Sequence, residues 1–139
     1  MIYSQVGVLH GSRSLTNQTC GGTLISNKYV VTSVYLCAER EMASETFAVI
    51  GDTILGTQYE AFSMIVNVEE IIAHGNYQKP EPANNYKPIN NIALLKLEES
   101  VPLTQYPSIK PACLPLQGDD FTGFEATATG WGSVFSSIS

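Results

Sequence analysis

Two cysteines near the start of the chain enclose the segment that most restricts how it can fold. Cys20 and Cys37 are the first and last residues of CGGTLISNKYVVTSVYLC. Between them lie a turn-rich start at residues 20–23 and two short runs, 24–26 and 29–32, that are mostly aliphatic, β-branched or aromatic. Runs of this length and composition are typical of β-strands. The segment therefore predicts two strands with a cysteine at either end.

Short runs of the same kind recur along the rest of the chain, and turn residues separate them about every eight to fifteen positions. Residues 62–68 place four apolar side chains on one face, which is the period of two of a half-buried strand. Helix-period patterns are scarce. This organisation predicts an all-β sandwich or barrel. The runs that we interpret as strands are 5–9, 20–25, 28–34, 47–50, 62–68, 92–97 and 126–131.

Two further segments have other signatures. Residues 74–91 (HGNYQKPEPANNYKPINN) are rich in proline and asparagine, which predicts a long exposed loop. Residues 38–43 are the one stretch for which we expect a helical turn.

Composition limits the class of protein. The 139 residues are 44% hydrophobic and 14% charged, which is typical of one globular domain, here residues 1–139. The formal charge of −6 argues against nucleic-acid binding, and no apolar run is long enough to cross a bilayer. Residues 1–10 lack the basic start and long apolar core of a secretory signal peptide.

Five stretches together resemble one family, in the same order along the chain. Residues 20–37 are similar to the CGGSLI strand and V-x-T-A-A-H-C loop of trypsin-like (chymotrypsin-family, S1) serine proteases. The other four are 70–77 (EIIAHGNY), 90–97 (NNIALLKL), 110–116 (KPACLPL) and 129–132 (TGWG). They resemble the family's I-I-x-H-P-x-Y, N-D-I-A-L-L-K-L, P-x-C-L-P and T-G-W-G stretches. The resemblance covers nearly all of this chain but only about the first half of the family's domain.

The resemblance implies a fold and a set of cysteine roles. We expect the N-terminal six-stranded antiparallel barrel of the trypsin-like fold, with the second barrel absent. The family pattern implies a disulfide between Cys20 and Cys37. Cys113 resembles a family cysteine that often bonds to an upstream chain or pro-segment, so it is expected to be either free or paired outside this chain. The barrel alone is expected to expose an apolar face where the second barrel would dock.

The family's catalytic residues do not carry over to this sequence. Between Thr32 and Cys37 the chain has four residues (SVYL), one more than the family pattern, and none is histidine. Tyr35 is the nearest counterpart of the general base, but a phenol is protonated at neutral pH and is a poor base. We interpret it as an aromatic side chain that fills space. Asn91 holds the position of the aspartate that orients the histidine, and we expect it to satisfy neighbouring backbone groups. Neither the G-D-S-G-G-P nucleophile motif nor an I-V-G-G-like activation terminus is present.

Other candidate sites are weaker. Asn17 begins an N-glycosylation triplet, and with the implied disulfide it predicts an extracellular protein, although no signal peptide is present. His10 and His74 occupy positions where family members often carry a structural histidine. Asp52 and Glu60 fall near the family's calcium loop but match it poorly. We therefore expect no metal and no cofactor.

The function predicted from the sequence is that of a non-catalytic serine protease homologue, or a fragment of one, which acts by protein binding if at all. Family homologues of this kind serve as cofactors or decoys in extracellular proteolytic cascades. The expected partners are therefore proteins of such cascades and, through Cys113, an upstream segment or chain. Two alternatives remain: a truncated record of a secreted trypsin-like serine endopeptidase, and a relic with no function of its own.

Overall fold

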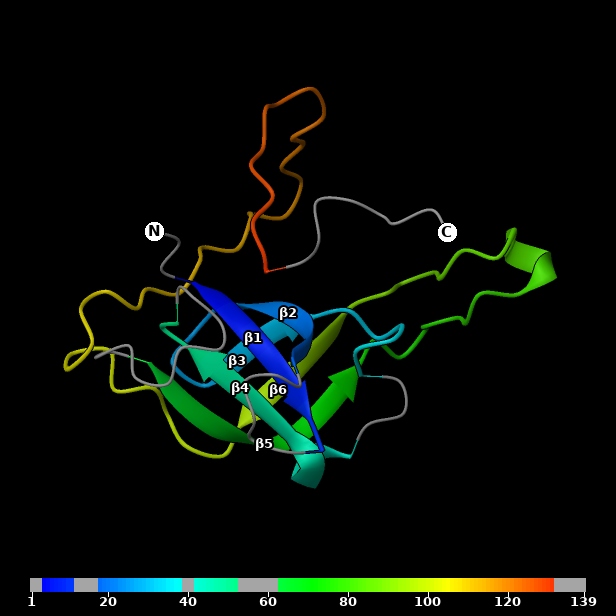
Figure 1. Cartoon of the computed structure of the whole chain (residues 1–139). Coiled ribbons are helices and arrows are strands. Elements are labelled where there is room, and N and C mark those ends of the chain that lie inside the picture. Colours follow the sequence, from blue (N-terminus) through cyan, green and yellow to red (C-terminus); the bar gives the residue numbers. More distant parts are fainter. Residues whose placement is uncertain (1–3, 12–17, 39–41, 53–62, 132–139) are drawn as a thin grey trace.

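The computed structural model describes residues 4–11, 18–38, 42–52 and 63–131. These described residues contain six strands and two short 3-10 helices (Figure 1). No helix in the described residues is long and apolar enough to cross a bilayer. The strands are β1 (Gln5–His10), β2 (Gln18–Leu24), β3 (Tyr29–Thr32), β4 (Thr46–Ile50), β5 (Met64–Ala73) and β6 (Ala93–Leu97), and the 3-10 helices are η2 (Ala43–Glu45) and η3 (Pro82–Asn84).

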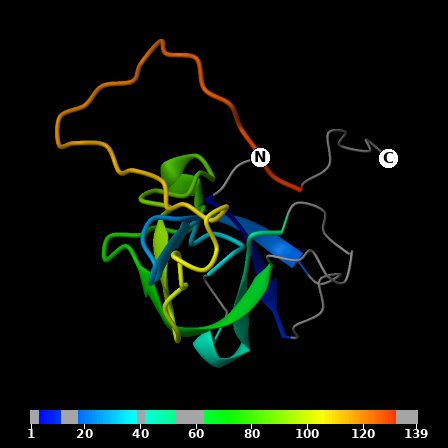
Figure 2. The same cartoon turned by 90° about the vertical axis from the view of Figure 1, so that its left-hand side faces the viewer.

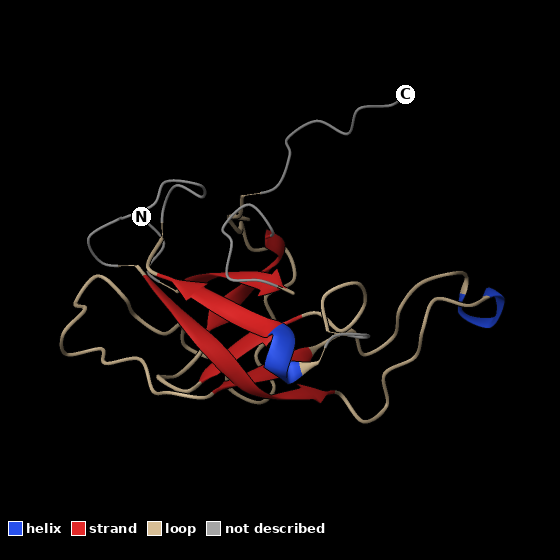
Figure 3. Ribbon diagram, turned by 60° about the horizontal axis from the view of Figure 1, so that its bottom comes forward, coloured by secondary structure: helices blue, strands red, loops and turns tan. Residues whose placement is uncertain are grey.

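The strands close into one antiparallel barrel in the order β1-β2-β3-β6-β5-β4. Pairing of β1 with β4, for example Val8 opposite Ala48, completes the ring. Closure leaves no strand edge exposed, which removes the main route to edge-to-edge aggregation. The predicted six-stranded barrel and all-β class are confirmed, and Figure 3 shows the strands (red) wrapped around a common interior.

Alternation along each strand decides which side chains fill the barrel. In β6, Ala93, Leu95 and Leu97 are buried, whereas Leu94 and Lys96 between them are only partly covered. This is the period of two that a strand imposes, because successive side chains point to opposite faces. The inward faces together form one core, whose buried members are Val6, Val8, Leu24, Val30, Ala48, Ile50, Val66, Val68, Leu95, Leu97, Val101 and Ile109.

Gly22 in β2 is required by this packing. A Cβ built on it would lie 2.7 Å from Cγ1 of Val30 and 3.1 Å from the carbonyl oxygen of Val31. Real Cβ atoms do not approach other heavy atoms so closely in a well-packed interior. The second glycine of the CGG stretch therefore allows β2 and β3 to lie together.

Most strand ends lie within two residues of the predicted ones, and larger differences occur in two places. β5 continues to Ala73, five residues beyond the predicted end, because Ile71, Ile72 and Ala73 pair with β6. Residues 126–131 were predicted to be a strand, and this is wrong: 126–130 are exposed and belong to no strand. All six barrel strands already have two neighbours, so the segment finds no edge to pair with.

Two smaller predictions can also be compared. Residues 39–41 of the predicted helical turn at 38–43 lie outside the described residues, and a 3-10 helix at Ala43–Glu45 begins at the last residue of that stretch. In the predicted face of 62–68, Val66 and Val68 are buried and Met64 packs against the core, whereas Phe62 lies outside the described residues.

Residues 74–92 form a long projection, which we call the arm. In Figure 1 it extends well away from the barrel, with η3 at its tip. A single antiparallel bridge joins Gln78 to Ile89, and hydrogen bonds run both ways between their backbones. The predicted exposed loop is confirmed, although it is partly paired and its tip is helical. Residues 111–131 leave the barrel in a second extended segment, drawn in orange and red in Figure 2.

Candidate functional site

The turn after β3 carries the first candidate residue, Tyr35. Residues 34–38 form a tight turn in which the backbone N–H of Ala38 donates to the carbonyl of Val34 at 2.9 Å. The turn directs Val34 inward, where it packs with Ala38 and Ala93 in a small second core. Tyr35 is directed outward and is 36% exposed. Tyr35 therefore does not fill the small second core, because Val34 takes the inward position there.

Leu36 is the strained residue of this turn. Its φ of 67° lies in the left-handed region, which costs a non-glycine residue about 1–2 kcal/mol. The side chain is 73% exposed, so burial does not compensate for that strain. Leu36 is therefore a strained, outward-facing residue beside Cys37, and β3, which precedes the turn, keeps its pairing with β2 and β6.

Asn91 is far from Tyr35 in the sequence but contacts it in the fold. Its Oδ1 accepts a hydrogen bond from the backbone N–H of Tyr35 at 2.7 Å. Asn91 lies at the base of the arm, two residues before β6, where the N–H of His74 donates to the carbonyl of Ile92 at 3.0 Å and so joins the two limbs of the arm. Asn90 adds a side-chain hydrogen bond to the carbonyl of Asn76 at 2.9 Å. The base of the arm thus fixes Asn91 against the turn that carries Tyr35.

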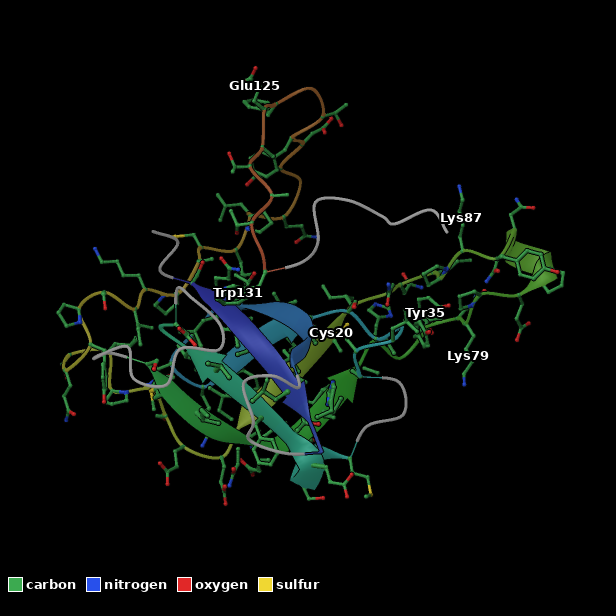
Figure 4. The ribbon with its side chains drawn as sticks, in the orientation of Figure 1. Cys20, Tyr35, Lys79, Lys87, Glu125 and Trp131 are labelled. Atoms are coloured by element: carbon green, nitrogen blue, oxygen red, sulfur yellow. A yellow bond between two sulfur atoms is a disulfide. The ribbon has the colours of Figure 1, made fainter. Side chains whose placement is uncertain are left out.

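The two residues form a hydrogen-bonded pair, which we call the Tyr35–Asn91 pair. They are 56 positions apart in the sequence, and Figure 4 shows Tyr35 at the base of the arm, where the arm leaves the barrel. The contact joins the amide of Asn91 to the backbone of Tyr35 and does not involve the phenol. It therefore aligns no donor for proton transfer between the side chains. A neutral carboxamide also supplies no negative charge to stabilise a cation beside it.

The disulfide lies next to this pair. The structure shows the bond between Cys20 of β2 and Cys37 at the end of the turn, as the resemblance implies. It closes a loop with a sequence separation of 17 and contributes about 3 kcal/mol in the chain-entropy model. The hydroxyl of Thr32 donates to the carbonyl of Gly21 at 2.9 Å, a second link between the same two parts of the chain. The turn is thus fixed from both sides.

An apolar hollow occupies the outer face of the barrel beside the pair. Val31, Leu94 and Ile72 are cross-strand neighbours on β3, β6 and β5, and they line the hollow together with Ile25, Ile92 and Leu114. Its volume is about 370 Å³. Leu114 is 63% exposed, so the wall of the hollow is open to solvent. The sequence predicted an exposed apolar face without assigning residues to it. Apolar residues at the outward positions of β3 and β6 are the feature of the sequence that indicates this hollow.

The two histidines and the acidic candidates lie apart from one another. His10 at the end of β1 is 3.3 Å from the hydroxyl of Thr46 through its Nδ1. His74 directly follows β5, and its Nδ1 accepts a hydrogen bond from the backbone N–H of Asn76 at 3.1 Å. Asp52 is buried after β4, and Glu60 lies outside the described residues. In the part of the chain that the structure describes, no three His, Cys, Asp or Glu side chains gather as metal ligands would.

The remaining predicted residues are Cys113 and Asn17. Cys113 is exposed and forms no disulfide; it lies in the extended segment that leaves the barrel. Asn17 lies outside the described residues.

A charged cluster lies on the outer surface of β5 and β6, where Lys96 shares the outward face of β6 with Leu94. Nζ of Lys96 donates to Oε1 of Glu69 at 2.9 Å, and Nζ of Lys28 lies 4.0 Å from the other carboxylate oxygen. The hydrogen bond from Lys96 and the charges of both lysines lower the pKa of Glu69. The same hydrogen bond raises the pKa of Lys96. The cluster joins neighbouring strands on a solvated face.

Comparison with known proteins gives matches along almost the whole chain. The family described as trypsin matches residues 3–138. The serine protease filzig of Drosophila melanogaster is 38% identical over 120 residues, which are 86% of this chain and 6% of that protein. Ovochymase-2 of Mus musculus is 34% identical over 116 residues, 83% of this chain and 18% of that protein. The inactive CLIP domain-containing serine protease A28 of Anopheles gambiae is 35% identical over 115 residues, 81% of this chain and 27% of that protein. The chain thus spans well under a third of the length of these relatives.

Proposed function

Because the chain belongs to the trypsin family, we propose that it is a non-catalytic serine protease homologue that acts by binding other proteins. One observation carries the proposal: the hydrogen bond between the carboxamide of Asn91 and the backbone of Tyr35. The resemblance places the general base and its orienting carboxylate at these two positions. A tyrosine and an asparagine hold them here.

Each substitution removes a separate part of the family's chemistry. The base must take the proton of the nucleophile and return it to the leaving group, which a protonated phenol does not do at neutral pH. In well-studied members of the family, replacing the aspartate by asparagine alone lowers kcat about 10⁴-fold. In this chain the amide of Asn91 has a structural role, because it holds the turn that carries Tyr35.

The exposed apolar surface supports a binding role. Besides the hollow, the extended segment that leaves the barrel exposes Leu116, Phe121 and Phe124 by 78%, 60% and 72%. Exposed apolar surface of this extent marks sites of protein contact. We propose that the partners belong to extracellular proteolytic cascades, since a disulfide such as Cys20–Cys37 persists in oxidising surroundings. One of the similar proteins, that of Anopheles gambiae, is itself named inactive.

Labelling by a fluorophosphonate probe tests the proposal, because the probe reacts only with an activated serine. The experiment uses this chain and the longest product of the same gene, with trypsin as the positive control. We expect no labelling of either product at a probe concentration that labels trypsin completely. Labelling that is lost after heat denaturation would contradict the proposal.

A binding experiment addresses the second half of the proposal. Leu114→Glu places a charge in the wall of the hollow, whereas Glu125→Gln changes an exposed residue of the segment beyond it. We expect the wild-type chain and Glu125→Gln to co-purify with the same proteins from extracellular fluid. Leu114→Glu should not recover these proteins. Identical recovery by all three would show that the hollow takes no part in binding.

Cys113 extends the proposal to covalent pairing. Its thiol is exposed, so we propose that it forms a disulfide with an upstream segment or chain outside these residues. The secreted product would then run at higher mass on a non-reducing gel, or lose a fragment on reduction, and Cys113→Ser would abolish the difference. Equal migration of wild type and variant under both conditions would exclude the pairing.

A further inference from the structure

The tip of the arm, which we define as residues 79–87, is ordered without burying anything. All nine residues are described, and none of them is buried. Burial of apolar surface is the dominant favourable contribution to folding, so the barrel gains little stability from the tip. Local hydrogen bonds nevertheless define its conformation around η3. The order of the tip therefore has to be explained by something other than core packing.

Asn84 holds the start of η3. Its Oδ1 accepts a hydrogen bond from the backbone N–H of Glu81 at 2.8 Å, and the side chain of Glu81 accepts one from the backbone N–H of Asn84. The two bonds form a capping box. Nδ2 of Asn84 also donates to the carbonyl of Lys79 at 2.8 Å. One side chain thus satisfies backbone groups at two positions of the limb that enters the tip.

The end of η3 fixes the backbone of Tyr86. The N–H of Asn85 donates to the carbonyl of Pro82 at 3.2 Å, and the N–H of Tyr86 donates to the carbonyl of Glu81 at 2.9 Å. With Asn85 in the left-handed conformation, this is the pattern of a Schellman motif. Tyr86 also has a positive φ of 56°, which is unfavourable for a residue with a bulky side chain.

The ring of Tyr86 is presented to solvent. In a Schellman motif the residue at this place often makes an apolar contact with the helix, but the facing position is held by Glu81, and Tyr86 is 71% exposed. Strained residues persist only where the surrounding structure holds them, and they concentrate at functional sites. The tip therefore keeps an exposed aromatic side chain in a strained and well-defined place.

Two lysines accompany Tyr86. The whole chain has 13 acidic and 7 basic residues, yet the tip contains Lys79 and Lys87 and a single acid, Glu81. Both lysines are exposed, and in Figure 4 they lie on the two limbs of the arm and point outward in opposite directions. The carboxylate of Glu81 is occupied by the backbone of η3. The tip is thus a small positive surface on an acidic protein.

The rest of the arm supports this surface. Hydrogen bonds between the backbones of Gln78 and Ile89 join the limbs directly behind the tip, and Asn91 anchors the base to the turn at Tyr35. A tyrosine offers a large amphipathic contact area with few rotatable bonds. Holding it in place before binding reduces the entropy that association has to spend.

We propose that the tip of the arm is a pre-formed binding element: Tyr86 enters an apolar pocket of a partner protein, and Lys79 and Lys87 pair with carboxylates at the rim of that pocket. Buried tyrosines dominate the energy of many interfaces, and charges at the rim steer association. The inference rests on the proposed function and deepens it, because it names a second contact surface, separate from the hollow. The partner class is a protein with an acidic rim around an apolar pocket.

Photo-cross-linking of the full chain, with its disulfide intact, tests whether the tip contacts a protein. One variant has p-benzoylphenylalanine in place of Tyr86. The matched control has it in place of Met42, which is 59% exposed and lies outside the arm, next to η2. Both are irradiated in extracellular fluid, and adducts are identified by mass spectrometry. We expect an adduct only from the variant at position 86, attached beside aspartate or glutamate of the partner and suppressed by excess wild-type chain.

Binding kinetics with the protein so identified test the side chains one by one. Tyr86→Ala should weaken binding about tenfold or more, mainly through faster dissociation, whereas Tyr86→Phe should retain most of the affinity. Lys79→Gln and Lys87→Gln should each slow association at low ionic strength, and high salt should remove the difference. Lys110→Gln removes an exposed lysine outside the arm and should bind as the wild type does. Lysine variants of the tip that associate at the wild-type rate would exclude an acidic partner.

Asn84→Ala tests whether the tip is pre-formed. It removes the capping box and the bond to Lys79 but leaves Tyr86 and both lysines in the chain. We expect binding to weaken severalfold, while urea unfolding shows a barrel as stable as that of the wild type. Wild-type affinity in this variant would show that the hydrogen bonds of the tip do not prepare it for binding.

Three results would overturn the proposal as a whole. They are the absence of an adduct from position 86, binding by Tyr86→Ala equal to that of the wild type, and an adduct made only of two copies of this chain. The proposed function is judged separately. If Tyr86→Ala recovers the same proteins as the wild type and Leu114→Glu loses them, only the inference about the tip fails. Fluorophosphonate labelling would refute the proposed function and leave the cross-linking result unchanged.

Discussion

The barrel interior and the Tyr35–Asn91 pair are both built on β3 and β6. The interior has the packing of a barrel core, whereas the pair lacks the ionisable groups of a catalytic site. β3 and β6 contribute Val30 and Leu95 to a fully buried core, and their inward residues alternate as a barrel requires. A few residues beyond the ends of these strands, the pair retains a hydrogen bond without an ionisable base or a carboxylate. The packing that builds the fold is therefore independent of the chemistry that the fold supports elsewhere in the family. Changes on the two sides of this comparison should have very different consequences.

The largest effect is expected in the interior. Leu95→Ala removes a fully buried side chain from β6 and should lower the free energy of unfolding by about 3 kcal/mol, from lost burial and the cavity left behind. Leu94→Ala, one residue away on the outward face, should cost clearly less. Urea unfolding followed by circular dichroism measures both. Equal losses for the two variants would contradict the assignment of inward and outward faces.

Loss of the disulfide should come next. A double variant, Cys20→Ala with Cys37→Ala, should lower the free energy of unfolding by about 3 kcal/mol at most, because it frees the loop that the bond closes. Cys113→Ala is the matched control, since Cys113 is exposed and forms no disulfide. A destabilisation by Cys113→Ala as large as that of the double variant would show that the thiol has a structural role.

The pair itself should contribute less. Asn91→Ala removes the acceptor of the Tyr35 backbone N–H and should cost about 1 kcal/mol. Asn91→Asp retains an acceptor at the same place, so the chain should remain at least as stable as the wild type at neutral pH. If Asn91→Ala were as stable as the wild type, the amide would not hold the turn.

Strain in the turn gives a change of similar size and opposite sign. Leu36→Gly replaces a residue whose φ is 67° and should raise the free energy of unfolding by about 1 kcal/mol. The same substitution at Leu114, whose φ is not positive, should not stabilise the chain. Destabilisation by Leu36→Gly would indicate that the exposed leucine makes a contact that matters.

The smallest effect concerns the surface cluster and depends on pH. Hydrogen bonding by Lys96 lowers the pKa of Glu69 from its ordinary value of 4.5. Because the pKa of Glu69 is lowered in the folded state, the stability that its ionised carboxylate contributes is fully present when the pH is above the ordinary pKa. This stability is lost as the pH falls through the folded-state pKa. Glu69→Gln should therefore lower the melting temperature slightly at pH 7, and the difference should vanish at low pH. A difference that grows on acidification would have the wrong sign.

Local patterns in the sequence predicted the strands and the all-β class, whereas the six-stranded barrel was predicted from the resemblance to the trypsin-like family. Alternation in β6 and the turn between β2 and β3 can be read from neighbouring residues. The arm could likewise be predicted as exposed from its prolines and asparagines. Long-range pairing could not be read in this way: the extension of β5 to Ala73 depends on β6, and the failure of residues 126–131 to form a strand depends on closure of the ring.

The candidate site was predictable in its residues but not in its geometry. Tyr35 and Asn91 were identified from the motifs that surround them. Their contact joins positions 56 residues apart, and the outward direction of Tyr35 follows from Val34 occupying the second core. The hollow could not be predicted from neighbouring residues, because its lining comes from three strands and from Leu114 in the segment that leaves the barrel.

Turnover of chromogenic peptide substrates with lysine or arginine before the scissile bond tests the central claim most directly. The measurement uses the longest product of the gene, purified under conditions in which trypsin keeps full activity. We predict a rate equal to that of buffer alone, because a tyrosine and an asparagine stand where the base and its carboxylate would be. Hydrolysis above that rate that a stoichiometric serine-directed inhibitor abolishes would contradict the account.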